Sequence, residues 1–150
     1  MNVSIKIPCT LIPVKRFNLL LPNSAIAEII VTNEIQIMPD APPWLYGTVN
    51  WQNHNIKIIL FDQIDTQDIR PEPHKSVITI IRNPVPNSKP AYLGILVRKT
   101  PQVLDANSHN LDRNLHPKNN HSCAISYATI NGKDALIPNI ESLVKLADKA

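Results

Sequence analysis

Residues 19–32 read LLLPNSAIAEIIVT, and residues 39–51 read PDAPPWLYGTVNW. In the first stretch, aliphatic and β-branched residues lie on both sides of a Pro-Asn-Ser turn. This arrangement predicts one strand at 17–21 and another at 26–32. Both stretches are punctuated by proline, so they indicate short strands and tight turns.

The second stretch begins with a proline-rich loop at 39–43. The residues after it, 44–47, predict one helical turn, because glycine is a typical helix-ending residue. A hairpin follows, with strands at 48–51 and 55–61. The residues expected to join these strands are Gln52, Asn53 and His54. Among them, asparagine adopts a left-handed turn conformation most readily.

Short elements are predicted on both sides of this block. Residues 4–11 alternate apolar and polar side chains, which is typical of a half-buried strand, and Pro8 indicates an edge position or an outward-facing missing donor. Asn131-Gly132 predicts a hairpin turn, and Asn139 predicts the N-cap of a closing amphipathic helix. The other predictions are strands at 76–82, 91–97, 102–105, 124–129 and 135–137, a short helix at 62–67 and a surface loop at 106–121.

The composition is that of a folded domain. The chain has 150 residues, of which 43% are hydrophobic and 18% are charged, so it can form a real core. Its length predicts a single domain, 1–150, with room for two lobes. About nine short strands and one terminal helix predict an all-β, closed or nearly closed barrel architecture.

Several classes of function are excluded by charge, hydropathy and glycine content. The net charge of +3 is spread along the chain, so we expect no nucleic-acid partner. No apolar run approaches the roughly 18 residues that cross a bilayer, and residues 1–10 lack the pattern of a secretory signal. We therefore expect a cytoplasmic protein with no membrane insertion. The three glycines lie far apart, which excludes a recognisable phosphate-binding loop.

No catalytic residue, metal or cofactor is predicted. Cys9 and Cys123 lie far apart, and in a chain without an export signal we expect two reduced thiols. A metal site remains an open alternative, because histidines and one cysteine lie close together in the sequence and these residue types bind metals. The residues concerned are His109, His116, His121 and Cys123, and their spacing matches no familiar zinc pattern.

Two tryptophans, Trp44 and Trp51, stand out because aromatic residues make up only 5% of the chain. Both could pack in the core. Alternatively, at least one of them could anchor a protein-binding surface, where tryptophan is enriched. The sequence leaves these alternatives open.

The block from 19 to 61 resembles the CheW family. In that family, a strand with an aliphatic-x-Glu-aliphatic pattern leads through a proline turn and a glycine to a hairpin that begins with asparagine. The sequences of residues 21–28 and 42–47 are most similar to the ChpC branch, which is linked with chemosensory control of type IV pili and twitching motility. The similarity spans about residues 4–146. It implies a mainly β fold of two interlocked small SH3-like barrels with a short C-terminal helix, in one domain.

The resemblance also implies a function. CheW-like proteins are non-catalytic adaptors without a cofactor, and they couple methyl-accepting chemoreceptors to a CheA-type histidine kinase. Ile26 and Glu28 match the family strand that faces the receptor groove, and Asn50 matches the hairpin asparagine. The full set of expected partner-binding residues is Ile26, Glu28, Trp44, Asn50, Trp51 and Gln52.

Some positions depart from the family pattern. Gln52 and Asn53 stand where the family usually has arginine and glycine, and Lys57 stands where a proline is common. Glu28 therefore cannot form an ion pair at position 52, and a hydrogen bond without a charged donor is roughly half as strong. Two alternatives follow: a decoy or insulator that binds only one of the two partners, or a metal-dependent enzyme that uses the His/Cys loop.

Overall fold

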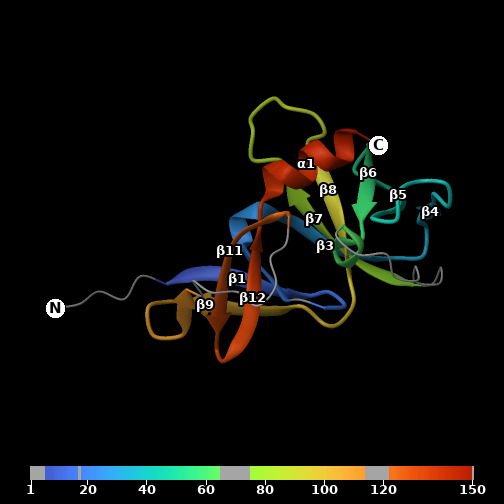
Figure 1. Cartoon of the computed structure of the whole chain (residues 1–150). Coiled ribbons are helices and arrows are strands. Elements are labelled where there is room, and N and C mark those ends of the chain that lie inside the picture. The colour runs from blue at the N-terminus through green and yellow to red at the C-terminus, as the bar shows by residue number, and fades with distance from the viewer. Residues whose placement is uncertain (1–5, 17, 65–74, 114–121, 150) are drawn as a thin grey trace.

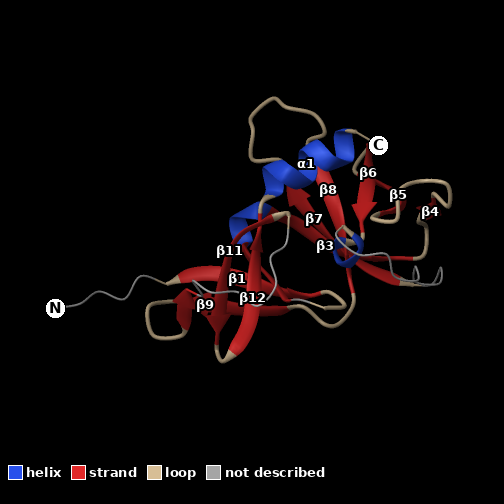
Figure 2. Cartoon of the chain, in the orientation of Figure 1, coloured by secondary structure: helices blue, strands red, loops and turns tan. Residues whose placement is uncertain are grey.

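The computed structural model describes residues 6–16, 18–64, 75–113 and 122–149. Within these residues the chain forms two six-stranded sheets, two short 3₁₀ turns and one α-helix (Figures 1 and 2). The mainly β fold class predicted from the sequence is confirmed. We call one sheet, with its turns, the terminal lobe and the other the middle lobe.

The terminal lobe is built from both ends of the chain. Its strands are β1 (Ile7–Pro13), β2 (Asn18–Pro22), β9 (Gln102–Ala106), β10 (Leu111–Arg113), β11 (Ala124–Ile130) and β12 (Lys133–Pro138), in the order β10-β11-β12-β2-β1-β9. All neighbours are antiparallel except β12 and β2. The turn at Asn131-Gly132 is confirmed, because both residues have positive φ, 49° and 76°.

The middle lobe is built from the intervening sequence. Its strands are β3 (Ile26–Thr32), β4 (Gln36–Ile37), β5 (Leu45–Trp51), β6 (His54–Ile59), β7 (Ser76–Arg82) and β8 (Tyr92–Val97), in the order β3-β7-β8-β6-β5-β4. The 3₁₀ turn η1 (Asn23–Ala25) leads into β3, and η2 (Phe61–Gln63) follows β6. The chain thus enters the terminal lobe, builds the middle lobe and returns, which interlocks the two.

The buried apolar side chains form three clusters. One fills the terminal lobe around Leu11, Leu20 and Ile130, and a second fills the middle lobe around Tyr46 and Ile58. The third, which we call the inter-lobe core, joins the two sheets beneath helix α1. Its buried members are Ile12, Val14, Leu19, Leu21, Ile59, Phe61, Ile81, Leu93, Ile95, Val97, Cys123, Leu136, Leu143, Val144 and Ala147.

Helix α1 (Ile140–Asp148) lies where the two lobes meet (Figure 1). Its N-cap prediction is confirmed, since the Ser142 amide donates to Asn139 Oδ1 at 3.2 Å. Its apolar face, Leu143, Val144 and Ala147, is buried in the inter-lobe core. The helix therefore closes the fold by covering apolar surface from both sheets.

The helical turn predicted at 44–47 is wrong. Leu45 begins strand β5, and the preceding loop ends in a β-turn in which the Leu45 amide donates to the Pro42 carbonyl at 2.9 Å. Gly47 serves another purpose there. A Cβ at this position would collide with the Gln36 backbone carbonyl, so glycine permits the close approach of β4 to β5.

Strand β1 does not lie at a sheet edge, which was one of the two alternatives predicted from Pro8, and it is not half-buried. It lies between β2 and β9, and residues of both faces are buried, including Leu11 and Ile12. The reason is that one face packs inside the terminal lobe while Ile12 packs in the inter-lobe core. Pro8 is tolerated because pairing with β2 begins only at Cys9, so that side of the strand needs no donor at Pro8.

Three further predictions change in detail. The β5–β6 turn has two residues, Gln52 and Asn53, with φ of 47° and 63°, because His54 already belongs to β6. The loop predicted at 106–121 contains strand β10, and its residues 114–121 lie outside the described residues. The helix predicted at 62–67 is the turn η2 as far as the structure describes it.

Candidate protein-binding site

The indole of Trp51 donates a hydrogen bond from Nε1 to Glu28 Oε2, with a distance of 2.6 Å. The two residues lie on strands that are not neighbours, because β7, β8 and β6 separate β3 from β5 in the sheet order. The middle sheet must therefore curl until its first and fifth strands meet. The bond is a charge-assisted contact across the open side of this curl.

Trp51 also belongs to an aromatic cluster, which we define as Trp51, His54 and Tyr92. The Trp51 and Tyr92 rings meet edge to face, with centroids 5.0 Å apart and planes at 76°. The His54 and Tyr92 rings meet in the same way at 4.9 Å and 72°. These rings come from β5, β6 and β8, and edge-to-face packing of this kind fixes their orientation. The Trp51 indole is thus held in place on one side by rings and on the other by a carboxylate.

Arg82 positions the strand that carries Glu28. Its Nη1 donates to the carbonyl oxygen of Ser24 at 3.0 Å and to that of Ile26 at 2.5 Å. These bonds tie the start of β3 to the end of β7, next to the register shift between Ile26 and Glu28. A bulge at this point re-aims the side chains that follow it, here Glu28.

Glu28 itself is exposed, and among the described residues no cation forms an ion pair with it. An ionised carboxylate offers about four acceptor sites, and the indole occupies one of them. The site therefore presents an oriented negative group, next to aromatic rings, to whatever approaches from solvent. This combination suits a cationic side chain of a protein partner.

The structure brings together only part of the set expected from the sequence. Glu28 and Trp51 are in contact, and Gln52 follows Trp51 in the turn. Ile26 and Trp44 are only partly exposed, and both pack against the inter-lobe core. Trp51 is likewise only partly exposed and packs against the apolar cluster of the middle lobe, but its Nε1 also bonds to Glu28.

Asn50 lies on the other face of β5 from Trp51, because successive strand residues point to opposite faces. His54 and Tyr92 belong to the aromatic cluster but are not among the site residues expected from the sequence. The only local signal for His54 is its position opposite Trp51 across the hairpin. No local signal marks Tyr92, which reaches the cluster through the parallel pairing of β6 and β8.

The described residues offer little for metal or thiol chemistry. No group of three or more metal-binding side chains occurs among them, and His116 and His121 lie outside this part of the chain. Cys123 is buried in the inter-lobe core, and Cys9 is buried in the terminal lobe. Burial raises the pKa of the Cys9 thiol, which disfavours the reactive thiolate. No helix in the described ranges is long and apolar enough to cross a membrane.

Comparison with known proteins gives a consistent result. The family model described as the CheW-like domain matches residues 9–148. Among solved structures, the chain is similar to the scaffolding protein TtCheW from Thermoanaerobacter tengcongensis, with a TM-score of 0.67. The two are 14% identical, and the match covers 89% of each chain, so this likeness concerns the fold. The comparison with curated proteins gave no match.

Proposed function

The chain belongs to the CheW-like domain family, and we propose on that premise that it is a non-catalytic adaptor in chemosensory signalling. In this role it couples methyl-accepting chemoreceptors to a CheA-type histidine kinase by binding both. Coupling of this kind is a free energy shared between binding surfaces, and it needs no reacting group. The proposal includes a cytoplasmic location and a single domain that extends over 1–150.

The observation that carries the proposal is the oriented Glu28 carboxylate beside the aromatic cluster. A residue that served only the core would not have an exposed carboxylate. A carboxylate that contacted only solvent would not accept a hydrogen bond from an indole at 2.6 Å. Aromatic residues and charge-assisted contacts are the usual anchors of protein interfaces. We assign Glu28 the role of accepting from a partner's lysine or arginine, and Trp51 the role of apolar anchor.

The other expected site residues have supporting roles in this proposal. Gln52 lies at the tip of the β5–β6 hairpin and would meet the same partner as Trp51. Ile26 sets the position of β3 through its contact with the inter-lobe core, as does Trp44 for the start of β5. Asn50 lies on the opposite face and would serve a different contact.

We further propose that the system served is one that controls type IV pili and twitching motility. This proposal is supported by the sequences of residues 21–28 and 42–47, which resemble the ChpC branch. Deleting the protein from its native host would then abolish twitching on agar while leaving pilus subunits in the cell.

A decoy or insulator role is the second candidate, and one observation favours it. The residue that holds Glu28 is a neutral indole, and the hairpin carries Gln52 in place of the arginine usual in the family. The site therefore has one negative group and no matching positive group in the hairpin. A partner that needs both charges would bind weakly, while a partner at another face would be unaffected.

Affinity purification of the tagged full-length protein from its native host, followed by mass spectrometry, separates these candidates. Recovery of a CheA-type kinase together with a chemoreceptor supports the coupling role. Recovery of only one of them supports the decoy or insulator. Recovery of neither would overturn both.

A further inference from the structure

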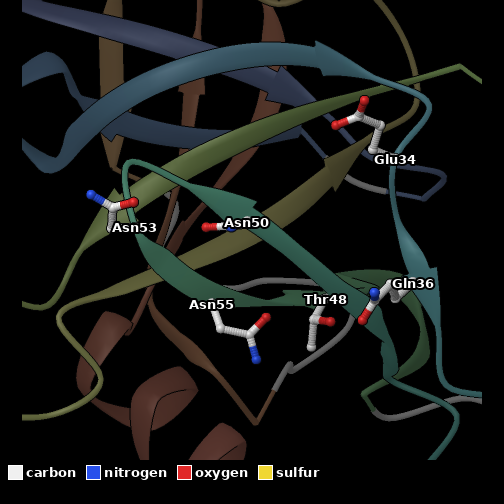
Figure 3. Close-up of a pocket in the computed structure, with 6 residues that line it drawn as sticks. All are labelled: Glu34, Gln36, Thr48, Asn50, Asn53 and Asn55. Atoms are coloured by element: carbon white, nitrogen blue, oxygen red, sulfur yellow. The ribbon is translucent and has the colours of Figure 1, made fainter.

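A polar hollow lies on the outer face of the middle lobe, and Figure 3 shows the residues that line it. It lies on the side of β5 opposite the Trp51 indole, because Thr48 and Asn50 alternate with Trp51 along the strand. Its volume is ≈570 Å³. Its lining comes from the short β4 segment and the β5–β6 hairpin, and it consists of Glu34, Gln36, Thr48, Asn50, Asn53 and Asn55. We call this feature the amide hollow, since four of its six residues carry a side-chain amide.

The amides are arranged in register by the sheet. Gln36 lies directly opposite Thr48 across the β4–β5 pair, and Asn50 lies opposite Asn55 across the β5–β6 pair. Thr48 and Asn50 are two residues apart on one strand, so their side chains share a face and repeat about every 6.8 Å. This spacing equals the two-residue repeat of any extended peptide.

These side chains are not used within the fold. In the described part of the chain, no hydrogen bond involves the side chain of Gln36, Thr48, Asn50, Asn53 or Asn55. Most other asparagines in the described ranges behave differently, because their side chains bond to turns, strand ends and a helix N-terminus, although Asn33, Asn87 and Asn131 have no such bond. Those with such bonds are Asn18, Asn23, Asn83, Asn107, Asn110 and Asn139. The hollow thus places next to one another four side-chain amides that have no internal bond among the described residues.

The chemistry of the lining restricts what can bind. Its described residues include no cation, so an anionic group would find no countercharge, and they include no apolar side chain, so an apolar ligand would gain little. A helix has few free backbone groups to offer, because its N–H and C=O groups bond to one another. An extended segment presents one free N–H and one free C=O per residue, and each amide side chain can bond both.

From this match we propose that the amide hollow binds an extended peptide segment of a partner protein through the segment's backbone amides. The only charge in the lining is Glu34, so the segment is neutral or basic. The site is distinct from the Glu28–Trp51 surface and does not depend on the partners proposed for that surface. A protein with both faces could hold one partner by a side-chain anchor and another by its main chain.

Phage display of short random peptides tests the proposal, with the full-length protein as bait and the N50A/N55A double variant used to remove peptides that bind elsewhere. Synthetic copies of the enriched peptides are then titrated by fluorescence anisotropy. We expect neutral or basic peptides without helical content by circular dichroism. Each amide removed should weaken their binding on the order of fivefold, as for loss of one neutral hydrogen bond. Q102A, which removes an exposed amide on the other sheet, should bind as the parent does.

Three results would overturn the proposal. The first is that no peptide is enriched over the double variant. The second is that the enriched peptides are helical or acidic, and the third is that neutral oligosaccharides on a glycan array bind in their place. If N50A/N55A does not fold, as judged by its thermal transition, the near-isosteric N55D decides the matter. In that case undiminished binding of a neutral peptide to folded N55D counts against the site.

Discussion

The ammonium group of Lys57 donates to the carbonyl oxygen of Ala147, with a distance of 2.8 Å. Lys57 lies on β6 of the middle lobe, and Ala147 lies in the last turn of α1. The carbonyls of a last helical turn have no partner within the helix and carry partial negative charge. A lysine therefore ties the closing helix to the sheet at a position where the family commonly has proline.

Replacing Lys57 by methionine tests this tie. The variant keeps the aliphatic stem but loses the charge and the donor, so we expect a loss of about 1 kcal/mol in the free energy of unfolding. In a domain of this size that corresponds to about 2–4 °C in the midpoint of thermal unfolding. The matched control is K99M, a change of an exposed lysine outside the strands, which should leave the midpoint unchanged. Equal midpoints for the two variants would show that the Lys57 bond does not stabilise the fold.

Glu28→Lys should separate binding from folding. Glu28 is exposed, so the folded state loses little beyond one bond to the indole, and we expect a nearly unchanged thermal transition. Recruitment of the partner in the affinity purification should fall sharply, because a like charge then faces the partner's cation. Asp40→Lys, a charge reversal in an exposed loop, provides the control and should retain recruitment. Unfolding of the Glu28 variant would instead show that the residue has a structural role.

A double-mutant cycle measures the contact between Glu28 and Trp51. Trp51→Phe removes the Nε1 donor but keeps a ring beside Tyr92, and Glu28→Gln removes the charge of the acceptor. We expect a coupling free energy of about 0.5–1 kcal/mol from urea unfolding, because the bond is charge-assisted but partly exposed to water. Additive effects of the two substitutions would mean that the bond contributes nothing in solution.

Gln52→Arg should strengthen recruitment of the chemoreceptor. Position 52 has a φ of 47° with a long side chain already in place, so arginine is tolerated in the turn. The guanidinium adds the positive charge that the hairpin lacks, and charged donors form the stronger bonds. Gln52→Ala, which adds no charge, is the comparison and should not raise recruitment. Recruitment that is the same before and after the Gln52→Arg change would argue against the importance of this position.

Gly47→Ala should destabilise the middle lobe. The added Cβ would collide with the backbone carbonyl of Gln36, which cannot move without breaking the β4–β5 pair. We expect a cost of about 1–3 kcal/mol in urea unfolding, as for other overpacked sites. Gly132→Ala offers a contrast, because open space surrounds that position and the cost of about 1 kcal/mol arises only from its φ of +76°. A smaller loss at position 47 than at position 132 would contradict the close approach.

Local patterns predicted most of the elements. Strands β3 and β7 were predicted to the residue, because β-branched content and the flanking turn residues are properties of a few neighbouring positions. The helical turn at 44–47 failed for the same reason, since a glycine after an aromatic residue looks locally like a helix end. Its actual purpose depends on Gln36, eleven positions earlier, and no local pattern contains that information.

The sequence by itself determined the fold class, the Asn131-Gly132 turn, the capped closing helix and the family resemblance. Each of these depends on short-range periodicity or on a contiguous motif. The tertiary structure decided what the side chains do. It placed Trp44 against the core and Trp51 beside Glu28, and it left the amides of the β5–β6 hairpin free on the opposite face. The physical reason is the curl of the middle sheet. Its closure brings β3 to β5 through packing between distant residues, and the free energy of that packing belongs to the whole core.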